Sequence, residues 1–293
     1  MKSNLKVWTG LGLATALVGA GLAGCAGESG EGGEGEGGAD TAIAGEAGEG
    51  EGGEGEGGEG EGGEGEGGEG EGGEGEGGVA VSDASTDPVV YGSALAIVEA
   101  HAIAARDAYA AGETEAAAEM FGHPVSEVLA DMDPVFEQLG VEDFKSEMNE
   151  ASAAALEADN ADGVEAAYQA ILTALSAAAE KAPTSDLSQG AVAAGVVADQ
   201  IDRATTMYSQ AAGSDIYEPY LDGYGFYKAA DSAFKRDGAA IATYNSGLHS
   251  DIEAALTLLA AAYPGAERPE TLDAEQGKLL GASSKVNLGL PAA

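Results

Sequence analysis

The side chains best suited to chemistry in this sequence are its three histidines, His101, His123 and His249. Two of them are followed four residues later by a glutamate, which gives the pairs His123–Glu127 and His249–Glu253. Residues four apart share one face of a helix, so each pair offers an imidazole and a carboxylate to the same ligand. Transition metals bind such donors, often inside helical bundles. The pattern predicts an iron, copper or zinc site formed by these five residues.

The same spacing has a purely structural interpretation. Asp and Glu make up 52 of the 293 residues, so a His–Glu pair at this separation also arises by chance. In that interpretation His123 caps or fills the end of a helix beside Pro124. Metal analysis of the protein and of variants at His123 and His249 separates the two interpretations.

A second candidate site is an aromatic stretch that mixes tyrosines with carboxylates and glycines. Its candidate pocket residues are Tyr217, Tyr220, Asp222, Tyr224 and Tyr227. Tyrosine beside a carboxylate can bind ferric iron or line a pocket for a sugar or a peptide. The alternative is a packed, kinked helix whose hydroxyl groups are hydrogen bonded to neighbouring atoms.

Motifs of common enzyme classes are absent from the sequence. It contains no Gly-x-Ser-x-Gly, no His-Glu-x-x-His and no phosphate-binding glycine loop. The single cysteine, Cys25, lies at the end of an apolar leader and offers no nucleophile once it is modified. These observations favour a binding protein over an enzyme.

Residues 1–24 have the features of an export signal, with Lys2 and Lys6 ahead of an apolar stretch too short to span a membrane. The run Leu-Ala-Gly-Cys that ends at Cys25 resembles the bacterial lipobox. This resemblance implies cleavage before Cys25 and attachment of lipid to its sulfur, which anchors the chain to a membrane. Ala26 follows in place of the aspartate that retains enteric lipoproteins, which favours the outer membrane where the host has one.

Residues 25–80 consist largely of Gly and Glu, with five successive copies of Glu-Gly-Gly-Glu-Gly. Gly has a high ordering entropy and Glu repels Glu, so we expect a disordered linker. It could serve as a spacer or as a brush that collects cations. Apart from the 18 acidic residues of this linker, the predicted folded domain that follows it has 34 acidic and 10 basic residues of its own, a formal charge of −24. Such a charge argues against nucleic acid as a partner.

The remaining residues, 81–293, are predicted to form one all-α domain, a bundle of about seven helices. Apolar residues recur at steps of three and four, and no long run of alternating β-branched residues is present. We expect a kink at Pro124. The expected helices cover 89–110, 113–139, 141–158, a face from 164 to 175, 187–211, 215–235 and 239–263, with a short helix at 274–280.

The segment from Phe121 to Leu129, which contains Gly122, His123 and Glu127, resembles the Gly-x-His-x-x-Glu signature of imelysin-like proteins and related periplasmic iron-uptake proteins. Here glycine directly precedes the histidine and the glutamate follows after four residues rather than three. The resemblance implies a helical bundle involved in iron acquisition, with His123 and Glu127 as the matching residues.

Two functions therefore follow from the sequence. The first is an envelope lipoprotein that binds a transition metal for uptake or delivery. The second is a tethered module, without metal, that binds an envelope protein, a peptide or a glycan through its acidic surface or its tyrosines. A hydrolase that uses carboxylates is the least favoured.

Overall fold

The computed structural model describes residues 81–291 except residue 158, and these residues form an all-α bundle without a β-strand. This confirms the predicted fold class. The predicted export signal, Cys25 and the Gly/Glu linker lie outside the described residues. The elements are η1 (Val81–Asp83), α1 (Pro88–Ala110), α2 (Thr114–Pro124), η2 (Val125–Leu129), α3 (Ala130–Leu139), α4 (Lys145–Ala155), α5 (Ala161–Ala179), α6 (Gln189–Ala212), α7 (Glu218–Tyr244), α8 (Ser246–Ala262) and α9 (Gln276–Leu288).

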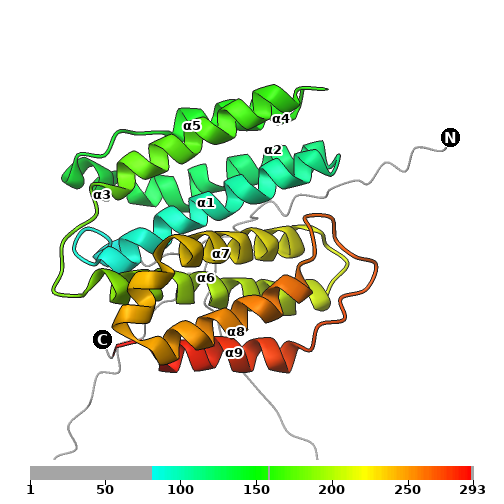
Figure 1. Ribbon diagram of the computed structural model, residues 1–293. Coiled ribbons are helices and arrows are strands. Elements are labelled where there is room, and N and C mark those ends of the chain that lie inside the picture. Colours follow the sequence, from blue (N-terminus) through cyan, green and yellow to red (C-terminus); the bar gives the residue numbers. More distant parts are fainter. Residues whose placement is uncertain (1–80, 158, 292–293) are drawn as a thin grey trace, which may run out of the picture. The chain divides into compact units, whose positions relative to one another are not determined.

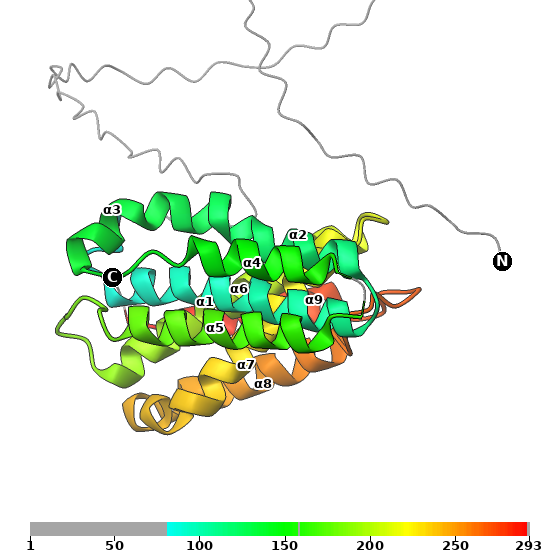
Figure 2. The same ribbon diagram turned by 90° about the horizontal axis from the view of Figure 1, so that it is seen from above.

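Helix α1 is the central element of the bundle (Figure 1). It packs against α2 and α5 on one side and against α6 and α7 on the other. Helix α4 completes the first group, and α8 and α9 complete the second. Figure 2 shows the helices running roughly along one common direction. The bundle therefore consists of two helical groups that share α1.

The composition of α1 explains its central place. The helix begins at Asp87, whose carboxylate Oδ1 accepts a hydrogen bond of 2.7 Å from the Val89 N–H, and Pro88 occupies its first turn. Among the described helices, α1 is the one long and apolar enough to cross a membrane. However, 78% of its most apolar 18-residue stretch is buried inside the protein. It is accordingly packed as a core helix.

Small residues let α7 approach its neighbours closely. A Cβ atom on Gly225 would lie 2.5 Å from the carbonyl oxygen of Ala100 in α1. A Cβ atom on Gly190 of α6 would lie 2.2 Å from the carbonyl oxygen of Ala240 in α7. The backbones of these helices are in direct contact at both places, which no residue larger than glycine allows without movement.

The predicted helix 113–139 is continuous but irregular. Helix α2 leads directly into the π-helical turn η2, and η2 leads directly into α3. The Ala130 N–H donates to the Val125 carbonyl, five residues back. Pro124 has no N–H to donate, and the wider turn that follows accommodates the prolines at 124 and 134. Gly140 ends the segment with a φ of 71°.

Several predicted helix boundaries were wrong, among them 141–158, where α4 covers only Lys145–Ala155. The break expected just before residue 239 occurs instead at Asn245, because Gly238 fits inside α7 beside the ring of His249. The side-chain oxygen of Asn245, Oδ1, accepts hydrogen bonds from the N–H groups of Gly247 and Leu248. It therefore caps the N-terminus of α8. The last helix, α9, is longer than the predicted 274–280.

Candidate metal centre

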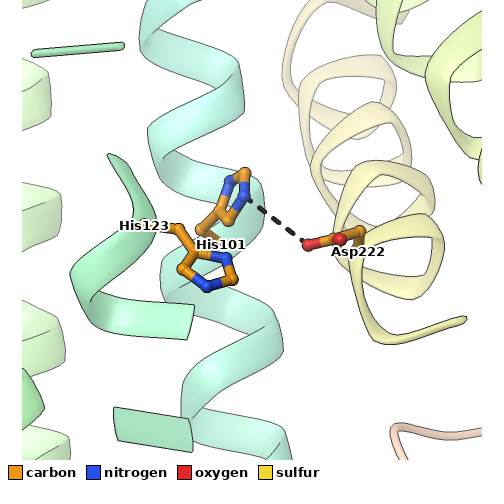
Figure 3. A group of neighbouring side chains, drawn as sticks. All are labelled: His101, His123 and Asp222. Carbon is orange, nitrogen blue, oxygen red and sulfur yellow. Dashed lines mark ion pairs between the residues drawn. The ribbon is translucent and has the colours of Figure 1, made fainter. Parts of the chain in front are cut away.

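Three potential metal ligands from three helices meet where α1, α2 and α7 adjoin (Figure 3). One donor atom from each of His101, His123 and Asp222 can be chosen so that all three lie within 4.8 Å of one another. The rings of His101 and His123 are 6.1 Å apart between centroids and meet edge to face. His101 and Asp222 are buried at 4% exposure each, and His123 is half-buried. We call these three residues the inner cluster.

The tautomer of His101 follows from its hydrogen bond. Its Nδ1 lies 2.8 Å from the Ile97 carbonyl oxygen, one helical turn back. A carbonyl only accepts, so Nδ1 carries the proton. Burial lowers the pKa of His101 to about 4, so the ring is neutral at pH 7. Its Nε2 is then unprotonated and offers a lone pair. The hydrogen bond from Nδ1 to the backbone fixes the orientation of the ring, as is typical of metal-binding histidines.

That lone pair faces two carboxylates. The Nε2 of His101 is 3.6 Å from Asp222 Oδ1 and 3.9 Å from Glu127 Oε2. An unprotonated nitrogen cannot donate a hydrogen bond to either oxygen, so these two contacts are not hydrogen bonds from His101. Nitrogen and carboxylate oxygen are both donors that transition metals accept. The arrangement therefore fits a metal ion by donor type.

The donor atoms must draw together to share one metal. Two donors that each lie about 2.1 Å from a metal in tetrahedral geometry are about 3.4 Å apart. A pair at the 4.8 Å limit of the inner cluster would therefore close by more than an ångström. Rotation of the three side chains is the movement that can supply this change.

Further carboxylates lead from the inner cluster towards the surface. The His123 Nε2 lies 3.6 Å from Glu218 Oε1, and Glu218 is half-buried. Burial raises the pKa of Glu218. Burial and the nearby charge of Glu218 raise the pKa of Glu119, which is exposed. Acidic groups thus extend from the buried inner cluster to the exposed Glu119.

One cation of the protein lies close to this site. Arg203 of α6 lowers the pKa of His101 through its charge, and its Nε donates to Asp199 at 3.0 Å. The carboxylates of Glu127, Glu218 and Asp222 also lie at this site, so acidic groups outnumber this cation.

Local structure positions each of these side chains. His101 lies on the central helix α1, and His123 lies in the last turn of α2. Glu127 lies in the π-helical turn η2, a kind of turn that is frequent at functional sites. Glu218 and Asp222 are four residues apart at the start of α7, so they project from the same face of that helix.

His101, His123 and Glu127, which the sequence indicates, therefore lie together. Asp222 was predicted for the tyrosine pocket and belongs instead to the inner cluster. Glu218 was missed, although its spacing of four from Asp222 on a helix was a usable signal.

The structure does not place His249 and Glu253 at this site. Both lie on α8, which packs against α6, α7 and α9 rather than against α1 or α2. The ring of His249 packs against Phe234, with 4.8 Å between centroids. Glu253 is exposed. The expectation that one histidine from each of three helices converges was therefore wrong for His249, and carboxylates from α7 occupy the third side.

The tyrosines of the second candidate site are used for packing. The hydroxyl groups of Tyr217 and Tyr220 donate to the carbonyls of Ala266 and Gly265, each at 2.8 Å. Tyr224 donates to Asp107 at 2.7 Å. Burial raises the pKa of Tyr220 to about 12, which disfavours the tyrosinate that ferric iron binds.

Tyr227 stacks on Tyr263, with 6.4 Å between ring centroids. Together these contacts favour the packed helix over a ligand pocket.

No protein-family model, no curated protein and no solved structure matches this chain. The resemblance to imelysin-like proteins stays a prediction carried by His123 and Glu127. The geometry of the inner cluster is accordingly the main basis for a functional proposal.

Proposed function

We propose that this protein is an exported lipoprotein, anchored to a membrane through Cys25, whose helical domain binds a divalent transition metal for uptake or delivery. The observation that carries the proposal is the convergence of His101, His123 and Asp222, with donor atoms within 4.8 Å of one another. Two imidazoles and one carboxylate are a donor set that iron(II) and zinc both accept.

Burial supports the proposal. A buried carboxylate beside a neutral imidazole costs free energy unless another charge balances it. Glu127 and Glu218 lie 3.9 Å and 3.6 Å from the nitrogens of His101 and His123, close enough to supply further oxygen ligands. A site with three fixed donors and two carboxylates at its rim can bind a metal and release it again, as uptake or delivery requires.

Metal analysis of the purified full chain tests the proposal. We expect about one equivalent of a transition metal, or one equivalent of added Co²⁺ with the absorption of a nitrogen- and oxygen-bound ion. The variants His101→Gln, His123→Ala and Asp222→Asn should each lower the affinity at least about tenfold, the range seen for lost ligands or their supports.

His249→Ala is the matched control, because the sequence alone nominates that residue and the geometry does not. Its metal affinity should equal that of the wild type. Loss of metal in this variant, or a wild type that binds none, would refute the proposal. In the second case the tethered interaction module becomes the better hypothesis, and a search for envelope partners would follow.

A further inference from the structure

A cleft of about 570 Å³ lies on the side of α1 away from the inner cluster. Helices α5 and α6 both pack on α1 but barely touch each other, and the cleft lies between them, over α1. Figure 1 shows α5 and α6 on opposite sides of α1. A volume of this size is typical of sites for small organic molecules.

Most of the cleft is apolar. Leucines and valines from three helices line it: Leu95, Leu172, Leu175, Val192 and Val196. Alanines and Gly92 form much of the remaining wall. Such a wall suits an aliphatic chain.

One end of the cleft is acidic. Glu99 of α1 lines it, and its Oε1 accepts a hydrogen bond of 3.2 Å from Ser232 of α7. Arg236 also lines the cleft, but its Nε donates to Asp237 at 2.9 Å and its side chain is 61% exposed. Among the described residues, Glu99 makes no ion pair within 4 Å. Burial raises the pKa of Glu99, and the charge of Arg236 and the hydrogen bond from Ser232 partly offset that effect. Glu99 and Asp237 together exceed the charge of Arg236 by one formal negative charge at this end of the cleft.

The cleft is separate from the candidate metal centre. Glu99 and His101 are two residues apart on α1, so their side chains leave the helix on opposite faces. The cleft lining contains none of His101, His123 or Asp222. A ligand in the cleft would accordingly not contact the metal.

We propose that this cleft binds a small hydrophobic organic cation, an aliphatic amine in its ammonium form. The ammonium group pairs with Glu99, where Ser232 already orients the carboxylate. The aliphatic chain lies along the leucines and valines between α5 and α6. An anionic or zwitterionic lipid is disfavoured, because its negative charge would lie against Glu99 and Asp237.

Calorimetric titration of the full chain with dodecylammonium, below its micelle concentration, tests the proposal. Dodecanol and dodecanoate serve as neutral and anionic probes of equal chain length. We expect dodecylammonium to bind at one equivalent and at least about tenfold more tightly than dodecanol, since a half-buried charge pair supplies the difference. Equal binding of all three probes would overturn the proposal.

Three variants locate the site. Glu99→Gln keeps the shape and should lower amine affinity about tenfold or more, whereas Ala193→Phe should fill the cleft and abolish binding of all probes. Glu253→Gln removes an equal charge from exposed α8 and should change nothing, which excludes attraction to the acidic surface in general. Unchanged amine affinity in Glu99→Gln would overturn the proposal even if Ala193→Phe fails to fold. Metal content, measured on the same samples, should equal that of the wild type.

Discussion

Gly225→Ala tests how closely α1 and α7 must approach. Gly225 is buried, and an added Cβ atom would lie 2.5 Å from the carbonyl oxygen of Ala100 and 3.0 Å from the Ala104 Cβ. Ordinary contact begins at 3.4 Å, so the helices would have to separate by about 0.9 Å at this point. The atom in the way belongs to the backbone of a helix and cannot rotate aside.

The magnitude follows from two opposing contributions. Overpacking of a rigid core costs about 1–3 kcal/mol, and a backbone clash belongs at the upper end of that range. Replacement of glycine by alanine inside a helix raises the free energy of unfolding by about 0.5–1 kcal/mol. We therefore expect Gly225→Ala to lower the free energy of unfolding by about 2 kcal/mol, measured by urea denaturation followed by circular dichroism.

Gly281→Ala is the matched control. Gly281 is exposed inside α9, and an added Cβ atom would meet nothing within 4 Å. This variant should gain about 0.5–1 kcal/mol. If Gly225→Ala is as stable as Gly281→Ala, the close approach of α1 and α7 described above is incorrect.

Three further predictions concern stability. The Arg268 guanidinium donates to three carbonyls at 2.6–2.9 Å, one in the last turn of α6 and two just after it. Arg268→Ala should therefore lower the free energy of unfolding by about 1.5–3 kcal/mol, and Arg268→Lys should restore little of it; full recovery with lysine would contradict a role for the fork geometry. Asp87→Ala should cost about 1 kcal/mol through the lost cap of α1, and Asp87→Ser should recover most of that loss in the same assay. In the metal-free protein, the pKa of His101 is 6.5 in the unfolded chain and about 4 in the fold. Above pH 6.5 the ring is neutral in both states, so the free energy of unfolding does not depend on it. As the pH falls to 4, the unfolded chain takes up the proton first, which lowers the free energy of unfolding by up to about 3 kcal/mol. The His101→Gln variant should show a shallower loss in that window, and equal slopes would contradict the buried, neutral imidazole.

The periodicity of apolar residues was sufficient to predict the helices. Val164, Tyr168, Ile171 and Leu175 share one face in the sequence, and all four are buried in α5. The same rule failed at an end, where Leu187 precedes α6 and is 41% exposed. Apolar periodicity indicates which face of a helix is buried. The end of a helix depends instead on a cap such as Asn245, and a single capping residue is a weaker signal in the sequence than a repeated apolar pattern.

The candidate metal centre could be predicted only in part. The local pair His123–Glu127 was visible because both residues lie in one turn of chain. The spacing of Glu218 and Asp222 indicates only that they share a helix face, and nothing in their own segment indicates that α7 packs beside α1, so neither was assigned to the centre. That packing depends on glycines such as Gly225, whose effect appears only when two distant helices are placed together.

Helix α1 links the two proposed sites, because Ala100 lies between Glu99 and His101 and contacts Gly225 directly. A shift of α7 by Gly225→Ala moves Asp222, three residues upstream on the same helix, away from His101. The amine cleft depends less on this contact, since neither Gly225 nor Ala100 lines it, although α1 and α7 contribute to its walls. We therefore expect Gly225→Ala to weaken metal binding by about tenfold or more, as for a displaced ligand, and to change amine affinity much less. An equal loss at both sites would mean that the variant disorders α1 itself, and an unchanged metal affinity would mean that Asp222 is not a ligand.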